Sequence, residues 1–169
     1  MATHRIPMQL YPNPGHANAI YEPTALNFGA NDRYPTWCWR FLDTATRDGI
    51  GFQVTIPKNY VGTPAFVLVS SATVTTGNLR LELDYRAIAK SGESLDPSTD
   101  QETLGLNQAA PGTARLGLES SLAATAANFA VDDVVLGTIV RDGAEGGGNA
   151  DTIASDWYLF EAYLQYADA

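Results

Sequence analysis

The chain contains two histidines, His4 and His16, and one cysteine, Cys38, the residue types that most often serve as general base and thiol nucleophile. Catalysis needs the base to be held rigidly beside its nucleophile. Both histidines fall in a proline-rich stretch that offers no such support. Cys38 lies between two tryptophans of a predicted strand, where a buried, inert thiol is expected. The sequence therefore predicts no catalytic histidine or cysteine.

Paired carboxylates would be a second source of catalysis, because two facing acids can hydrolyse a glycoside. Glu82 and Asp84 share one face of a predicted strand. Arg80 and Arg86 flank them on that face, which is the pattern of a self-neutralising ladder on a solvent-exposed surface. We therefore expect no glycosidase chemistry from this pair, and we predict that the protein is not an enzyme.

Acidic loops could bind calcium, which takes several oxygen ligands. No spacing matches an EF-hand loop, and acidic loops are expected without any metal in a chain of net charge -9. The glycine-rich run GAEGGGN has no P-loop lysine after it and opens no helix, so phosphate binding is not predicted either. We expect no metal ion and no cofactor. The acidic residues concerned are Asp96, Asp100 and Glu102 in one loop, and Asp132, Asp133, Asp142 and Asp151 near the last turn.

An aromatic stripe is the remaining candidate for binding. Trp37, Trp39 and Phe41 alternate along one predicted strand, so their side chains share a face, and Tyr34 precedes them. Such a stripe usually belongs to a core or to an oligomer interface. The alternative is a flat platform on which sugar rings stack, with Trp37 and Trp39 as its residues.

The length, net charge and cysteine count limit which kinds of partner the protein can have. The 169 residues suffice for one domain with a sizeable core. The net charge of -9 repels nucleic acid and anionic membranes, so neither is an expected partner. One cysteine excludes an internal disulfide, and the first residues contain no apolar core of signal-peptide length. These features predict a soluble, unexported chain with assembly in a reducing cytoplasm.

The elements that position these residues are strands, because apolar residues recur with period two and helical spacing is nowhere sustained. About eight strands without crossover helices predict an all-β fold, an antiparallel β-sandwich that is jelly-roll-like. An immunoglobulin-like sandwich is the next alternative, although its cysteine pair is absent. Residues 90–112 are expected to form a long surface loop, and residues 113–127 are ambiguous between helix and strand. The clearest predicted strands are 34–42, 50–56, 65–72, 78–89, 134–141 and 157–166.

The first 35 residues differ from the rest, since they hold five of the nine prolines. Proline fixes φ and removes a backbone donor, so an extended segment with at most short edge strands is expected. We predict two parts: an N-terminal arm, 1–35, and a β-sandwich domain, 36–169. Leu10, Tyr11 and Tyr21 make the arm too apolar for a solvated tail, so it should pack either on its own domain or on a neighbouring protein. Of these two alternatives we assign the three residues to an oligomer or partner interface.

The last strand, 157–166, is apolar on both faces. The even-numbered side chains include no charge and are predicted to point into the sandwich. The odd-numbered face mixes apolar and polar groups, as an interface does. The residues predicted to pack inside are Tyr158, Phe160, Leu164 and Tyr166, and those predicted to face a partner are Trp157, Leu159 and Tyr163.

The C-terminal segment 131–169 resembles the ending of many virion structural proteins of tailed bacteriophages. In those endings a strand runs into an Arg-Asp corner, here Arg141 and Asp142. An acidic, glycine-rich loop and a final apolar strand follow, here residues 143–155 and 157–166. The resemblance implies a jelly-roll component of the decoration, head-fibre or appendage type, usually a homotrimer. It carries over no catalytic residue.

Two functions follow from these observations. The first is a non-enzymatic virion structural protein, assembled in the host cytoplasm, that contacts itself and other virion proteins such as the major capsid protein. The second is a carbohydrate- or receptor-binding β-sandwich module, with exposed aromatic side chains as its working surface.

Overall fold

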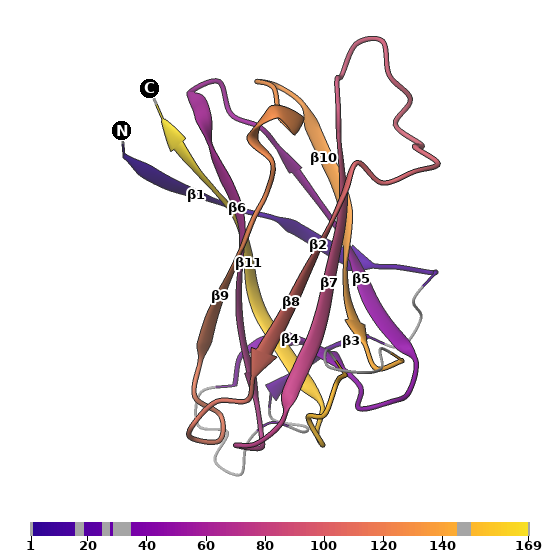
Figure 1. The fold of residues 1–169 in the computed structure, drawn as a ribbon, viewed down its shortest axis with the longest axis vertical. Helices are drawn as coiled ribbons and strands as arrows, with labels where there is room; N and C mark the ends of the chain where they lie inside the picture. The colour runs from indigo at the N-terminus through magenta and orange to yellow at the C-terminus, as the bar shows by residue number, and fades with distance from the viewer. Residues whose placement is uncertain (1, 16–18, 25–27, 29–34, 145–149, 169) are drawn as a thin grey trace.

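A computed structural model describes residues 2–15, 19–24, 28, 35–144 and 150–168. His16, Tyr34 and most of the GAEGGGN run lie outside the described residues. The described chain forms two antiparallel sheets packed face to face (Figure 1). The predicted all-β, jelly-roll-like sandwich is therefore confirmed. In chain order its strands are β1 (Thr3–Pro7), β2 (Gln9–Pro12), β3 (Ile20–Pro23), β4 (Trp37–Phe41), β5 (Arg47–Thr55), β6 (Tyr60–Ala72), β7 (Asn78–Ile88), β8 (Glu102–Ala109), β9 (Leu118–Ala123), β10 (Val134–Asp142) and β11 (Trp157–Asp168).

Sheet A has the strand order β3-β4-β11-β6-β9, and β1 also pairs with β11. Sheet B has the order β2-β5-β10-β7-β8. The core between them is rich in aromatic rings: Phe66 contacts Phe52 and Tyr85 at centroid distances of 5.4 and 5.1 Å. β7 shows the expected alternation, because Leu79, Leu81, Leu83 and Tyr85 are buried while the residues between them are partly exposed.

In the described residues no helix has the length and apolarity that a membrane span requires.

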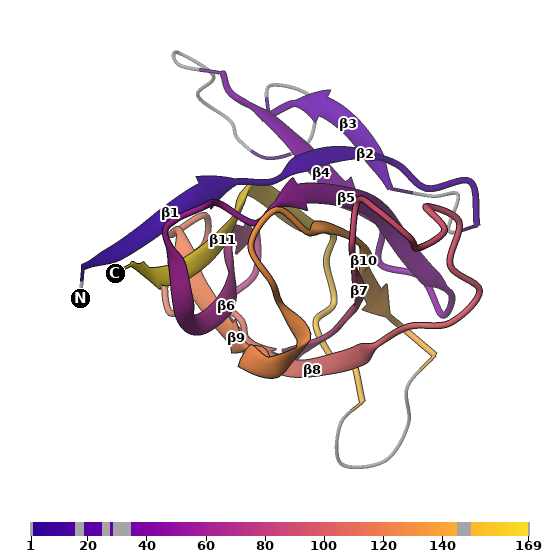
Figure 2. The same cartoon turned by 90° about the horizontal axis from the view of Figure 1, so that it is seen from above.

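The N-terminal segment belongs to the sandwich, which corrects the predicted division at residue 35. β1 pairs with β11 in sheet A over five positions, and β2 pairs with β5 in sheet B over four. Between them the chain passes from one sheet to the other, as the indigo ribbon shows in Figure 2. Met8 lies at this crossing, buried in the core, and its N–H donates to the Ala162 carbonyl at 2.9 Å. Prolines end both strands rather than preventing them, because an edge position tolerates a missing donor.

The predicted faces of the last strand are only partly correct. Trp157 and Leu159, expected to face a partner, are in the core, 2% and 0% exposed. Tyr158 and Phe160, expected inside, instead contact the ring of Phe28 at 4.9 and 5.4 Å. The cause is a register shift between Leu159 and Glu161. A bulge adds one residue and exchanges the two faces from that point on, so that Ala162 and Leu164 are in the core.

One strand was not predicted. Residues 102–109 were expected to lie in a loop but form β8, which pairs with β7 at the edge of sheet B. Its outward side chains are small or polar, and Leu104 and Leu106 are the only large apolar residues on its inward face. Two apolar residues were too few to show the alternation that predicts a strand. Residues 113–127, ambiguous in the sequence, contain β9.

Candidate functional site

Three aromatic rings form a cluster on the hairpin of β3 and β4. Tyr21 is paired with Trp39 across the ladder, so both side chains lie on one face. The Tyr21 ring lies 5.0 Å from the ring of Trp37, nearly parallel to it at 25°, and 5.0 Å from the ring of Trp39, tilted by 41°. Tyr21 therefore contacts both tryptophans of the predicted platform.

The cluster runs from the core to the surface. Trp39 is 7% exposed and belongs to the core, whereas Trp37 is 55% and Tyr21 54% exposed. Of the two residues predicted for a ligand platform, only Trp37 is available to a ligand. Tyr21 replaces Trp39 as the second exposed ring of the cluster. We call Tyr21 and Trp37 together the aromatic edge.

The hairpin beneath the aromatic edge is tied down on its other face. Arg40 forms ion pairs with Glu22 at 3.0 Å and with Asp156 at 3.1 Å. Beyond the strands, the Thr24 N–H donates to the Thr36 carbonyl at 2.8 Å, and the Thr36 N–H donates to the Thr24 hydroxyl at 3.1 Å. These contacts hold both rings on a supported backbone, as a preorganised binding surface requires.

Cys38 lies on the supporting face and is buried, as predicted. Its Sγ donates to the Glu22 carbonyl at 3.6 Å. Burial, with a further contribution from the Glu22 charge, raises the pKa of the thiol to about 11. The thiol is therefore protonated at neutral pH and is a poor nucleophile.

His4 joins the two ends of the chain. Its Nε2 lies 2.7 Å from the Asp168 carboxylate, and its ring stacks on Tyr166 at 5.6 Å. A hydrogen bond from the Ala2 N–H, followed by the His4 contact, lowers the pKa of Asp168. This arrangement stabilises the pairing of β1 with β11 and gives the histidine a structural role.

The surface ladder predicted on β7 forms only in part, through Arg80 and Glu82. Glu82 forms ion pairs with Arg47 and, at 3.6 Å, with Arg80. Asp84 accepts a 2.6 Å hydrogen bond from the Thr103 hydroxyl. Arg86, expected to join this ladder, instead donates to Thr99 of the neighbouring loop.

The acidic loop residues do not converge on a metal site: in the described part of the chain no group of three or more metal-ligating side chains could hold an ion. Glu102 accepts hydrogen bonds from Thr125, Asn128 and Tyr85. Burial, together with the Glu102 contact, raises the pKa of the Tyr85 hydroxyl. Asp133 caps the Ala130 N–H at 2.8 Å, and Asp151 pairs with Arg141.

The side chains predicted to face a partner are scattered. Tyr163 is half-buried on the outer face of sheet A, where its hydroxyl donates to Glu161. Leu10 packs against the core from β2, while Tyr11 on the same strand is 36% exposed on the other face. With Trp157 and Leu159 in the core, these residues do not form one surface.

No protein-family model and no curated protein matches this sequence. Solved structures similar to it include a family 35 carbohydrate-binding module from Clostridium thermocellum, 14% identical over all of both chains with a TM-score of 0.46. The xylan-binding module CBM15 is 12% identical over 99% of this chain and 97% of its own, with a TM-score of 0.47. The enzymatically active domain of tailspike protein 4 of bacteriophage CBA120 is 12% identical over 93% of this chain and 19% of its own, with a TM-score of 0.45. Most of these similar structures are carbohydrate-binding modules, but likeness at this level assigns no function.

Proposed function

We propose that this protein is a carbohydrate-binding β-sandwich module and that the aromatic edge, Tyr21 with Trp37, stacks against sugar rings. The observation that carries the proposal is the pair itself: two contacting aromatic rings, each more than half exposed, on a hairpin held by ion pairs. Exposed apolar side chains that adjoin one another mark interaction sites more often than apolar side chains scattered singly over a surface.

The chemistry of the edge suits a sugar. A pyranose ring presents C–H groups on its faces and hydroxyls around its rim, and an aromatic ring likewise has an apolar face with a polar group at its end in Tyr and Trp. Because the two rings are already stacked on each other, little side-chain freedom would be lost on binding. The net charge of -9 disfavours acidic glycans, so we expect a neutral one.

Replacing Trp37 with alanine tests the proposal. We expect the Kd for the best neutral oligosaccharide from a glycan array to rise about tenfold to a hundredfold, since losing one stacked ring removes about 1.5–3 kcal/mol. Isothermal titration calorimetry measures the change, and circular dichroism checks that the variant is folded. Tyr163→Ala is the matched control, because it removes an aromatic ring elsewhere on sheet A. An array without any bound glycan, or an unchanged Kd for Trp37→Ala, would refute the proposal.

Self-association, as in the virion role, is the second candidate for the same surface. It is favoured by Ile20, which is 41% exposed on the opposite face of the same hairpin, opposite Arg40, and gives the hairpin a second exposed apolar group that sugar stacking on the aromatic edge does not use. This hypothesis predicts a homotrimer in light scattering at micromolar concentration, and dissociation of that trimer by Trp37→Asp. A monomer of 18.1 kDa at every concentration that still binds a glycan would decide against it.

A further inference from the structure

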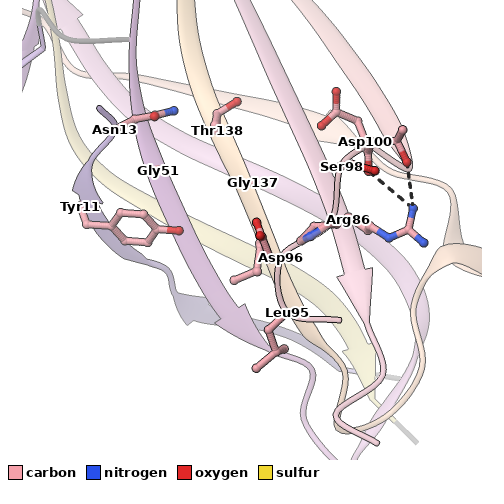
Figure 3. A pocket seen from close by; sticks show the side chains of 13 residues that line it. Tyr11, Asn13, Gly51, Arg86, Leu95, Asp96, Ser98, Asp100, Gly137 and Thr138 are labelled. Carbon is pink, nitrogen blue, oxygen red and sulfur yellow. Dashed lines mark hydrogen bonds between the residues drawn. The ribbon is translucent and has the colours of Figure 1, made fainter. Parts of the chain in front are cut away.

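A pocket of about 450 Å³ lies on the outer face of sheet B. Figure 3 shows it between the strands β5, β10 and β7 and the loop of residues 95–100, with Tyr11 of β2 at its side. Its volume is within the range of small-molecule sites, about 300–1,000 Å³. The aromatic edge contributes no residue to it.

An aromatic ring forms one wall of the pocket because a glycine leaves room for it. Tyr11 and Gly51 are paired across β2 and β5, and an added Cβ on Gly51 would lie 2.2 Å from the Tyr11 ring. The ring therefore rests directly on the backbone of β5. Its hydroxyl donates to the Phe52 carbonyl at 3.2 Å, which fixes its orientation.

The opposite wall is a loop fastened to β7. The Arg86 guanidinium reaches the carbonyl and hydroxyl of Thr99 at 3.5 Å each. The Gln101 N–H donates to the Tyr85 carbonyl at 2.8 Å, and the Gln101 side chain accepts from the Ala87 N–H at 2.9 Å. These bonds hold the loop over the sheet, so the pocket is formed before any ligand arrives.

Three polar side chains of the pocket have no partner among the described residues. Within the described ranges, no hydrogen bond engages the side chains of Asp96, Asp100 or Thr138, and no carboxylate forms an ion pair with Arg86. The pocket is thus lined by two carboxylates, a guanidinium and a hydroxyl, with one aromatic ring at its side. Hydrogen-bond donors and acceptors in one pocket with a flat apolar surface match the rim and the face of a sugar ring.

We propose that this pocket is a second sugar-binding site, specific for a neutral glycosyl unit. This inference rests on the proposed carbohydrate-binding function and extends it from one surface to two. The two aspartates outnumber the single arginine, and the chain as a whole carries a charge of -9. A uronic acid or sialic acid would therefore be repelled, whereas sugar hydroxyls can accept from Arg86 and donate to both aspartates.

The test separates the two surfaces by working in the Trp37→Ala background. Cellohexaose, xylohexaose and mannohexaose are the neutral probes and hexagalacturonic acid is the acidic one, each followed by NMR shifts of the backbone amides. We expect one neutral probe to shift Gly51, Leu136 and Thr138 amides and the acidic probe to shift none. Adding Tyr11→Ala should raise the Kd at least tenfold, whereas Tyr11→Phe, which keeps the ring, should change it about twofold at most.

Gly51→Ala is a second, independent variant, because its methyl group would displace the Tyr11 ring. It should weaken binding as Tyr11→Ala does. Gly112→Ala is the control, since no atom lies within 4 Å of its added Cβ. Absence of shifts at the pocket with all four probes, or an unchanged Kd in both Tyr11→Ala and Gly51→Ala, would overturn the inference. If Trp37→Ala alone leaves the wild-type Kd unchanged while the Tyr11 variant loses binding, the proposal of sugar binding at the aromatic edge is refuted and the proposal of sugar binding in the pocket is supported.

Discussion

Replacing Arg141 with methionine should lower the free energy of unfolding by about 3–5 kcal/mol, the usual result of removing one partner from a buried ion pair. The guanidinium is 1% exposed and the Asp151 carboxylate 4%. Arg141 Nε donates to Asp151 at 2.8 Å, and its Nη2 donates to Asp43 at 3.1 Å. Methionine would leave the Asp151 charge buried without its partner.

The same side chain also closes the loop that leads into β11. Arg141 donates to the carbonyls of Ser155 at 2.8 Å and of Ile153 at 3.0 Å. Both acceptors would lose a charge-assisted bond in the variant, which adds to the cost. The melting temperature should fall by about 10 °C, given about 2–4 °C per kcal/mol for a chain of this size.

Thermal melts followed by circular dichroism measure the effect. Arg5→Met is the control, because the Arg5–Glu119 pair is exposed and should contribute almost nothing. The double variant Arg141→Met with Asp151→Leu should be less destabilised than Arg141→Met alone, since it removes both charges. A single variant as stable as the wild type would mean that the buried network contributes nothing to stability.

Deleting residues 1–12 should largely unfold the domain or lower its melting temperature by more than about 10 °C. The deletion removes β1 and β2, one from each sheet, and exposes the β5 edge above Ile50 and Phe52. It also removes Met8 from the core, a loss that by itself costs about 2–5 kcal/mol. Against a typical total stability of about 5–15 kcal/mol, this loss is severe.

Circular dichroism and a thermal melt of the truncated chain test this expectation. Gln9→Ala is the matched control, because it alters an exposed side chain and keeps both strands. A truncated chain with an unchanged melting temperature would show that the N-terminal segment is the separable arm that the prolines alone had suggested.

Local pattern was sufficient for much of the fold. Alternation in residues 78–88 predicted both β7 and its buried face, and the two-sided apolar runs at 134–141 and 157–166 predicted the central strands β10 and β11. It failed in β8, because an edge strand buries one face only partly and needs few apolar residues. The alternating pattern also failed to predict the face on which Phe160 lies. The bulge at this position depends on how β6 pairs with β11, and the sequence of β11 alone does not reveal it.

The sequence by itself determined that strands of period two would form a sandwich, that Cys38 would be buried, and that Trp37 belonged to an aromatic stripe. Only the tertiary structure decided that Trp39 enters the core, that Tyr21 comes to lie against Trp37, and that Tyr11 rests on Gly51 beside a polar pocket. The physical reason is the range of the interactions. Alternation along one strand reports which side chains share a face, but the neighbour across that face comes from a strand distant in sequence, whose register is set when the whole sandwich packs.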